Sequence, residues 1–418
     1  MLGSVSAFAQ FGGGNGTAGN PYQIKTRQHL EALSDSVDKS PSNNATTGYN
    51  WSRNKYFKVM NPITDSVRTM IGLNSSSAHR AFQGNFDGQK YKITLAINMP
   101  TRQNVGLFSV VAGKKFENII VDGYVIGSML VGGIIGEILI ENKVPIDTIR
   151  INKCINMANI TTSSSANITC VGGIVAAVSY LPPMLNSRIV FIDSSSNIGK
   201  IVAGGNYEGA GGGIMGSSAL TTRIKHCTNI GFITGKTFAG GIAGQFYGEI
   251  LECNNIGTIT GKIVGGMVGY MGDEEYGNGI NRITRCINAG LIQYDNGGTS
   301  PYGLAVGGIV GVTVTTPNNS ISNIIENCLN TGVIEGTKST NLGGILGKRG
   351  NNTTVTNCHY DKQMCIYGSI NRAEIAGQAE GHFTINMVGT KLQPKFGTTS
   401  WIYFDYLYPM LRSLYFMQ

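Results

Sequence analysis

Carboxylates are the first side chains to consider for chemistry, because glycan-cleaving enzymes and calcium sites both depend on closely spaced acidic groups. The chain of 418 residues has only 24 acidic residues, and they are widely spread. The best cluster is Asp273, Glu274 and Glu275, in the segment after a glycine-rich block. An acidic, solvated turn explains this cluster equally well. We therefore assign no catalytic or calcium-binding residue, and a polysaccharide lyase or hydrolase stays the alternative to a binding protein.

Histidine and glycine patterns do not identify a further site. The five histidines, none of which lies in a recognisable catalytic motif, are His29, His79, His226, His359 and His382. We expect each of them at the surface or in a capping segment. A metal site at Cys358, His359 and Cys365 would be one ligand short and has the wrong spacing for zinc. The glycine-rich blocks also lack the strand-to-helix turn with Lys-Ser/Thr of a phosphate-binding loop, so no cofactor is predicted.

The cysteines follow an internal repeat. Six of the eight occupy one repeat position: Cys154, Cys227, Cys253, Cys286, Cys328 and Cys358. Ser195 fills this position in another copy, which indicates a need for a small side chain rather than for a sulfur–sulfur bond. We expect packed, unpaired thiols there, because free cysteine is among the most buried residue types. Cys170 and Cys365 lie outside the pattern, and a Cys358–Cys365 disulfide remains open.

Two sequence blocks alternate along more than half of the chain. A glycine-rich block occurs seven times, as GGIIG (132–136), GGIVA (172–176), GGIMG (212–216), GGIAG (240–244), GGMVG (265–269), GGIVG (307–311) and GGILG (343–347). The second block is Ile, two residues, Cys or Ser, one residue, Asn, one residue, Gly or Ala, one residue, Ile. Its six complete copies begin at Ile151, Ile192, Ile224, Ile250, Ile283 and Ile325. A seventh copy keeps Val355 and Cys358 but loses the asparagine.

Short fixed blocks with connectors of variable length are typical of a solenoid. The shortest repeat takes 25 residues, from 240 to 265, and the extra residues of longer repeats fall in stretches such as 270–281 and 293–304. Because each block is short, rich in Ile and Val and closed by Gly or Asn, we expect strands separated by bends. Stacked coils then pair in parallel, about 4.8 Å apart, with isoleucine ladders inside, an asparagine ladder at a bend, and a kink between Ile and Cys.

Segments at the two ends of the repeats should cover the open edges of the outermost coils. Pro21 to Ile24 is expected to form a short strand, and Thr26 to Val37 an amphipathic helix with Thr26 as its N-cap. Residues 38–55 are rich in Ser, Asn and Thr and should form a loop. The segment from 366 to 418 contains an aromatic run, and we expect it to cap the opposite end. Its aromatic residues are expected to pack there rather than to form a ligand platform.

Composition limits the class of partner. The chain is 41% hydrophobic and 13% charged, with 59 glycines that lack collagen spacing, so it can bury a large core. The net charge is +8, but basic residues are scattered, and no nucleic-acid-binding patch is predicted. Ala7-Phe8-Ala9, in the opening MLGSVSAFAQ, has the form that signal peptidase cuts. No segment is apolar enough to span a membrane and the first cysteine is Cys154, so we expect an exported, soluble protein without a lipid anchor.

These motifs resemble a known family of repeats. GGIVG with its Cys-x-Asn-x-Gly partner is similar to the glycine-rich GLUG repeat of bacterial surface and secreted proteins, including adhesin-like proteins and the non-catalytic part of some immunoglobulin A peptidases. The resemblance extends to GNGTAGNPYQIKTRQHLEAL (14–33), FQGNFDGQKYKITLAI (82–97), NVGLFSVVAGKKFENIIVDG (104–123), VTNCHYDKQMC (355–365) and TSWIYFDYLYPML (399–411). It implies a right-handed parallel β-helix and maps no shared active site.

The sequence thus predicts an all-β solenoid with a defined order of segments. Residues 1–10 are expected to be a signal-peptide remnant, 11–55 the N-terminal strand, helix and loop, 56–365 the β-helix, with the clearest repeats at 104–360, and 366–418 the C-terminal cap. The expected function is adhesin-like binding at the cell surface or outside the cell, through the variable loops, to a glycan, matrix or neighbouring cell. A structural spacer without a ligand is the third possibility. The oligomeric state is left unassigned.

Overall fold

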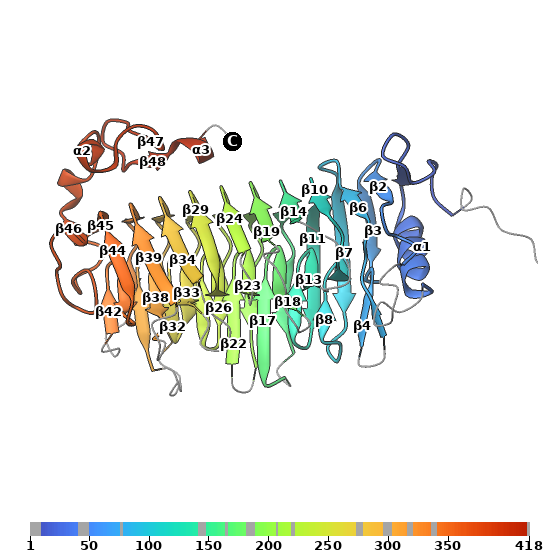
Figure 1. The fold of residues 1–418 in the computed structure, drawn as a ribbon, viewed down its shortest axis with the longest axis horizontal. Helices are drawn as coiled ribbons and strands as arrows, with labels where there is room; N and C mark the ends of the chain where they lie inside the picture. The colour runs from blue at the N-terminus through green and yellow to red at the C-terminus, as the bar shows by residue number, and fades with distance from the viewer. Residues whose placement is uncertain are drawn as a thin grey trace, which may run out of the picture.

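The protein is a parallel β-helix, seen here in a computed structural model as a rod of stacked coils (Figure 1). The structure describes residues 10–40, 50–75, 78–140, 148–163, 166–180, 189–205, 208–218, 222–272, 279–295, 303–315, 321–335 and 341–415. The acidic cluster at 273–275 and most of the variable stretch at 293–304 therefore lie outside the described residues. No helix in the described part of the chain is long and apolar enough to cross a membrane.

Each complete coil contributes to four parallel sheets. The first sheet contains β1 (Tyr22–Ile24), β2 (Tyr56–Val59), β6 (Asn85–Asp87), β10 (Lys115–Glu117), β14 (Thr148–Asn152), β19 (Ile189–Asp193), β24 (Thr222–Lys225), β29 (Gly248–Leu251), β34 (Gly279–Thr284), β39 (Ile321–Glu326) and β44 (Thr353–Thr356). The second sheet follows it around the coil and contains β3 (Ile63–Val67), β7 (Lys92–Asn98), β11 (Ile120–Gly127), β15 (Ile155–Asn156), β16 (Asn159–Thr162), β20 (Ser196–Asn197), β21 (Ile201–Ala203), β25 (Thr228–Asn229), β26 (Ile233–Gly235), β30 (Asn254–Asn255), β31 (Ile259–Gly261), β35 (Ile287–Asn288), β36 (Ile292–Tyr294), β40 (Leu329–Asn330), β41 (Ile334–Glu335), β45 (Cys358–Asp361) and β46 (Ala379–His382).

The other two sheets flank the glycine-rich blocks. The third sheet contains β8 (Asn104–Val105), β12 (Leu130–Gly132), β17 (Ile168–Gly172), β22 (Glu208–Gly212), β27 (Phe238–Gly240), β32 (Ile263–Gly265), β37 (Ala305–Gly307) and β42 (Asn341–Gly343). The fourth contains β9 (Phe108–Val111), β13 (Ile135–Ile140), β18 (Val175–Tyr180), β23 (Met215–Ser218), β28 (Ala243–Phe246), β33 (Val268–Met271), β38 (Val310–Thr313) and β43 (Leu346–Lys348). The first glycine of each block stacks on its counterpart, as in Gly240↔Gly265 and Gly265↔Gly307.

The expected ladders are present and the repeat sets their register. Isoleucines stack on isoleucines inside the rod, as Ile233, Ile259 and Ile292 do. The six asparagines are fully buried, and the first five each donate from Nδ2 to the Oδ1 of the asparagine in the next coil at 2.7 or 2.8 Å, from Asn156 to Asn330. The second Nδ2 proton goes to a carbonyl two residues along, as in Asn255 to Gly257 at 3.1 Å. Buried amides are tolerated there because their polar groups are paired.

The asparagine ladder also explains the second glycine of each block. A Cβ added to Gly241 would overlap the carbonyl oxygen of Gly266 and the side-chain amide of Asn255. The same close approach recurs at Gly266 with Gly308 and Asn288. The two repeated blocks therefore meet in space, and glycine is required because the backbone lies directly against the ladder.

The N-terminal end of the rod is covered as expected. Helix α1 (Arg27–Asp38) begins after Thr26, whose hydroxyl accepts a hydrogen bond from the His29 backbone N–H at 3.4 Å. Leu30, Leu33 and Val37 lie on its buried face, which closes the first coil (Figure 1). An antiparallel pair, β4 (Leu73–Ser75) and β5 (Ala78–Arg80), extends from the early coils.

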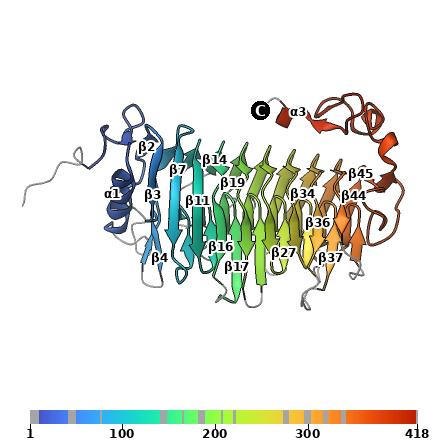
Figure 2. The same cartoon turned by 180° about the vertical axis from the view of Figure 1, so that it is seen from behind.

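The C-terminal cap has two parts. Residues up to His382 cover the last coil, where β46 pairs with β45 and Ile370 pairs with Leu346. The chain then turns back along the side of the rod, as Figures 1 and 2 show. This returning part, which we call the tail (residues 384–415), contains η2 (Thr384–Asn386), α2 (Gln393–Phe396), β47 (Trp401–Ile402), β48 (Met410–Leu411) and α3 (Arg412–Tyr415). The aromatic run therefore lies along a lateral face, because apolar side chains on that face receive it.

Candidate functional site

The kink expected between Ile and Cys is a single residue in the left-handed backbone conformation. These residues, which we call the bend column, have φ between 48° and 55° and are Asn118, Lys153, Ser194, His226, Glu252, Arg285, Asn327 and Asn357. Such a φ costs about 1–2 kcal/mol for most side chains, and the stacked neighbours hold it in place. The bend turns the chain from the first sheet into the second and lets charged side chains of successive coils meet.

Beside the bend column, two rows of side chains face outward from the second sheet. They are the two variable positions of Cys-x-Asn-x-Gly, since Cys and Asn face inward and side chains alternate along a strand. The inner row, which follows the cysteine position, is Ile155, Ser196, Thr228, Asn254, Ile287 and Leu329. The outer row, which follows the asparagine, is Met157, Ile198, Ile230, Ile256, Ala289 and Thr331.

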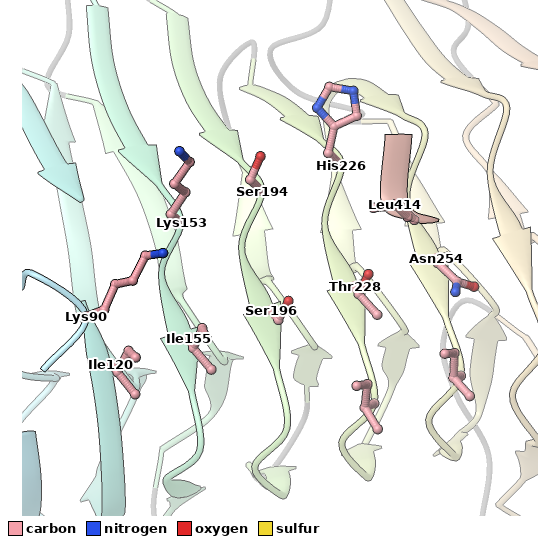
Figure 3. Close-up of a pocket in the computed structure, with 12 residues that line it drawn as sticks. Lys90, Ile120, Lys153, Ile155, Ser194, Ser196, His226, Thr228, Asn254 and Leu414 are labelled. Atoms are coloured by element: carbon pink, nitrogen blue, oxygen red, sulfur yellow. The ribbon is translucent and has the colours of Figure 1, made fainter. Parts of the chain in front are cut away.

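The tail covers these rows on the C-terminal coils. Ile287 and Leu329 form an apolar cluster with Met387, Leu392, Trp401 and Leu411 of the tail. Polar bonds fix the same contact: the Ser400 hydroxyl donates to Glu252 at 2.9 Å, and the Tyr408 hydroxyl donates to Asp361 at 2.5 Å. The last described helix, α3, reaches the coil of Asn254, as Leu414 does in Figure 3.

Where the described tail ends, the same face continues as an open groove of about 580 Å³ (Figure 3). Its lining combines polar and apolar side chains of the inner row, isoleucines of the outer row, bend-column residues and lysines. The lining residues are Lys90, Ile120, Lys153, Ile155, Ser194, Ser196, His226, Thr228, Ile230, Asn254, Ile256 and Leu414. Three outer-row side chains are about half exposed, with Ile198 at 45% and Ile230 and Ile256 at 51%. A second hollow of about 350 Å³ shares Asn254, Ile256 and Leu414 with it and runs along the tail.

An ionic network around His226 borders the groove on the side of the bend column. Asp193 Oδ1 lies 2.8 Å from Nδ1 of His226, whose Nε2 lies 3.6 Å from Glu252 Oε2, while Arg285 Nε donates to Glu252 Oε1 at 3.0 Å. The hydrogen bond to Asp193, followed by the contact with Glu252, raises the pKa of His226 to about 9. At neutral pH His226 is therefore a fixed cation between two carboxylates, and it is not available as a general base.

Two lysines of the groove lie outside this ionic network. Lys90 and Lys153 line the groove on coils that are separated by the coil of Asn118, and Figure 3 shows both side chains beside the groove. Within the described part of the chain, neither ammonium group forms an ion pair with a carboxylate. Both ammonium groups can therefore meet an anionic ligand in the groove.

The residues considered for chemistry lie in separate places. His29 is in the N-terminal cap, where its Nδ1 accepts from the Lys25 backbone N–H at 3.0 Å, and the side chain of His79 lies outside the described residues. All eight cysteines are free and buried, so Cys358 and Cys365 are not bonded. His359 and His382 come together at the last coil, with Nδ1 of His359 3.0 Å from Nε2 of His382. Burial lowers the pKa of His359 to about 4.

Sequence reasoning identified the fixed residues of the second block and missed the groove. The signal was in the two variable positions between those fixed residues. Ile198, Ile230 and Ile256 occupy one position in three consecutive copies, although this position faces solvent. A single exposed apolar residue is ordinary, whereas a row of them at one repeat position makes this face a candidate interaction surface.

Comparison with known proteins adds little to this geometry. No protein family model matches the chain, and no curated protein matches it. A similar solved structure is the crystal structure of a putative immunoglobulin A1 protease from Bacteroides ovatus, with 17% sequence identity and a TM-score of 0.46, covering 97% of this chain and 96% of the other. The fold assignment given above rests on the strand register and on the asparagine and isoleucine ladders of this chain.

Proposed function

We propose that this protein is an adhesin-like binding protein of the cell surface or extracellular space, and that its groove receives a segment of an anionic glycan. The observation that carries the proposal is the open stretch of the lateral face, where exposed isoleucines and polar side chains repeat from coil to coil and two lysines without an ion-pair partner among the described residues lie at one end of the groove. The similarity of the repeats to the GLUG family and the Ala7-Phe8-Ala9 signature support the location of the protein outside the cell.

The three kinds of side chain suit a charged sugar chain. Ser196, Thr228 and Asn254 can donate and accept hydrogen bonds with sugar hydroxyl groups. The isoleucines of the outer row can pack against the C–H faces of sugar rings, which removes apolar surface from water. Lys90 and Lys153 supply cations for carboxylate or sulfate groups, and the net charge of +8 favours approach of a polyanion. Coils about 4.8 Å apart present the polar side chains and the isoleucines repeatedly, as an extended polymer requires.

Binding of an acidic polysaccharide, compared with its carboxyl-reduced neutral form, tests the proposal. The wild-type chain should bind the acidic form more tightly, and added salt should weaken that binding because it screens the lysines. Removing both charges in K90Q/K153Q should weaken binding about 3- to 10-fold, as expected for two exposed charge contacts. The matched control K114Q/K348Q removes two exposed lysines outside the groove and should bind as the wild type does.

A second variant addresses the apolar row. I230T/I256T should weaken binding of the acidic and the neutral glycan alike, since both isoleucines line the groove and packing against sugar rings does not depend on their charge. Equal affinity of wild type and both groove variants would overturn the groove as the site. Release of shortened or unsaturated products by the wild-type chain would favour the carbohydrate-active enzyme instead.

A further inference from the structure

The last coil and the C-terminal cap bring three metal-binding side chains together. Strand β46 pairs in parallel with β45, which places Glu380 opposite His359 and His382 opposite Asp361. One ligand atom from each of His359, Glu380 and His382 lies within 4.8 Å of the others. These residues are separate from the groove, and their grouping depends on pairing between the rod and its cap.

The spacing of the ligand atoms fits a single ion. Nδ1 of His359 lies 3.0 Å from Nε2 of His382, and that Nε2 lies 3.8 Å from Oε2 of Glu380. Ligands at the usual 2.0–2.2 Å from a tetrahedral zinc ion are about 3.3–3.6 Å from one another. Small rotations of the two partly exposed side chains, His382 and Glu380, are enough to reach that geometry. His359 is only 1% exposed and is the fixed member of the group.

The neighbouring hydrogen bonds orient His359 for this role. Asn357 Nδ2 donates to the carbonyl oxygen of Lys395 at 2.8 Å and to Oδ1 of Asn327 at 2.6 Å, which fixes the orientation of the amide. Its Oδ1 therefore accepts from Nε2 of His359 at 3.0 Å. A neutral imidazole that donates from Nε2 keeps its lone pair on Nδ1, the atom that faces His382. Metal-binding histidines commonly have their second nitrogen held in this way.

We propose that His359 Nδ1, His382 Nε2 and a carboxylate oxygen of Glu380 form a site for a divalent ion of the zinc class, with water as the remaining ligand. Two imidazoles and one carboxylate are a ligand set that zinc accepts in proteins, and His382 and Glu380 leave one side open to solvent. Binding requires that the His359–His382 hydrogen bond opens and that Lys395 Nζ, 3.5 Å from Glu380, moves aside.

The position of the site gives it a structural role. His359 belongs to the rod, and His382 and Glu380 belong to the cap that leads into the tail. Asn357 links the same group to Lys395, and the ring of Phe396 contacts His359 with 5.1 Å between centroids. A bound ion would therefore tie the last coil to the cap and stabilise the start of the tail, since binding to the folded state alone stabilises that state.

Calorimetric titration of the EDTA-treated full-length chain with Zn²⁺ alone tests this site. The wild type should bind one ion per chain, and H382Q should bind it at least tenfold more weakly, because loss of a ligand should cost no less than loss of a supporting hydrogen bond. E380Q should weaken binding as well. H29Q changes a histidine in the distant N-terminal cap, keeps a side-chain acceptor for Lys25, and should bind as the wild type does.

Co²⁺ absorption gives a second measurement that does not depend on variants. The wild type should give the visible bands of a four-coordinate ion without a thiolate charge-transfer band, since the cysteines are buried in the rod. Zn²⁺ should also slow proteolysis of the tail. Absence of wild-type binding at 100-fold excess of Zn²⁺, unchanged binding in both ligand variants, or a thiolate band would each overturn the proposal.

Discussion

Two regions of one lateral face differ in how the same repeat positions are used. On the coils that the tail covers, the inner row is apolar, with Ile287 and Leu329, and the outer row is small or polar, with Ala289 and Thr331. On the three open coils nearest the tail the pattern is reversed: the inner row is Ser196, Thr228 and Asn254, and the outer row is Ile198, Ile230 and Ile256. The next open coil is apolar in both rows, with Ile155 and Met157.

The difference distinguishes the interior positions, whose residue types the fold requires, from the outward positions, whose residue types can vary. Both regions share the interior ladders, so the outward positions are not set by the core. Under the tail, apolar inner-row residues receive Trp401, and a small outer row lets the tail approach. On the open coils no segment of the described chain covers the isoleucines, so their row contributes little to stability. The lateral face is thus covered by the tail on some coils and exposed on others.

The largest effect is expected from a charge placed in the interior that both regions share. Ile259 is fully buried between Ile233 and Ile292. Ile259→Asp should lower the free energy of unfolding by several kcal/mol, because a buried carboxylate without a partner is strongly unfavourable. Urea denaturation followed by circular dichroism measures the loss.

The matched control is Ile256→Asp, which makes the same substitution on the same coil, in the outer row. Ile256 is 51% exposed, so this change should alter the free energy of unfolding by no more than about 0.5 kcal/mol. Comparable losses in the two variants would contradict the assignment of Ile256 to a free surface.

A smaller and local effect is expected when the tail is released from the covered coils. Trp401 is fully buried and stacks on Phe396 at 4.3 Å between ring centroids. Trp401→Ala should remove about 3–5 kcal/mol of packing free energy. We expect this loss to exceed the free energy that holds the short tail against the rod, so the tail should detach. Amide hydrogen exchange should then show loss of protection in β47 and β48, while β31 and β36 stay protected. Ile385→Ala changes a tail side chain that is 69% exposed and should leave protection unchanged; parallel loss throughout the rod would instead mean that the tail is part of the core.

The repeated part of the fold could be predicted from sequence because each fixed residue contacts its counterparts in the adjacent coils, so the same residue type recurs in every copy. Asn255 and Gly241 are examples: one repeats because it pairs with the coils on both sides, and the other because the ladder leaves no room for a side chain. Thr26 likewise indicates the start of α1 by its capping chemistry.

The candidate sites could not be predicted in the same way, because they depend on contacts between segments without a shared period. The course of the tail is decided by Trp401 and Leu411 meeting Ile287 and Leu329, which a local pattern does not encode. His359, Glu380 and His382 are brought together by the pairing of β45 with β46. The His226 network is closer to the repeat, since a left-handed bend in every coil makes the residue before each cysteine a neighbour of its counterparts.

The smallest effect is expected at the border between the two regions, where His226 meets Asp193 and Glu252. The folded-state pKa of His226 is raised to about 9, above the ordinary value of 6.5, so protonation stabilises the folded chain. By linkage this contribution is fully present below about pH 6.5 and is lost as the pH rises through about 9. The difference in free energy of unfolding between wild type and His226→Gln should therefore shrink from pH 6 to pH 10 in urea denaturation. Asp193→Asn removes the strongest partner of His226 and should move the loss to lower pH. A difference that stays constant over this range would mean that the imidazole is neutral and does not contribute to holding Glu252.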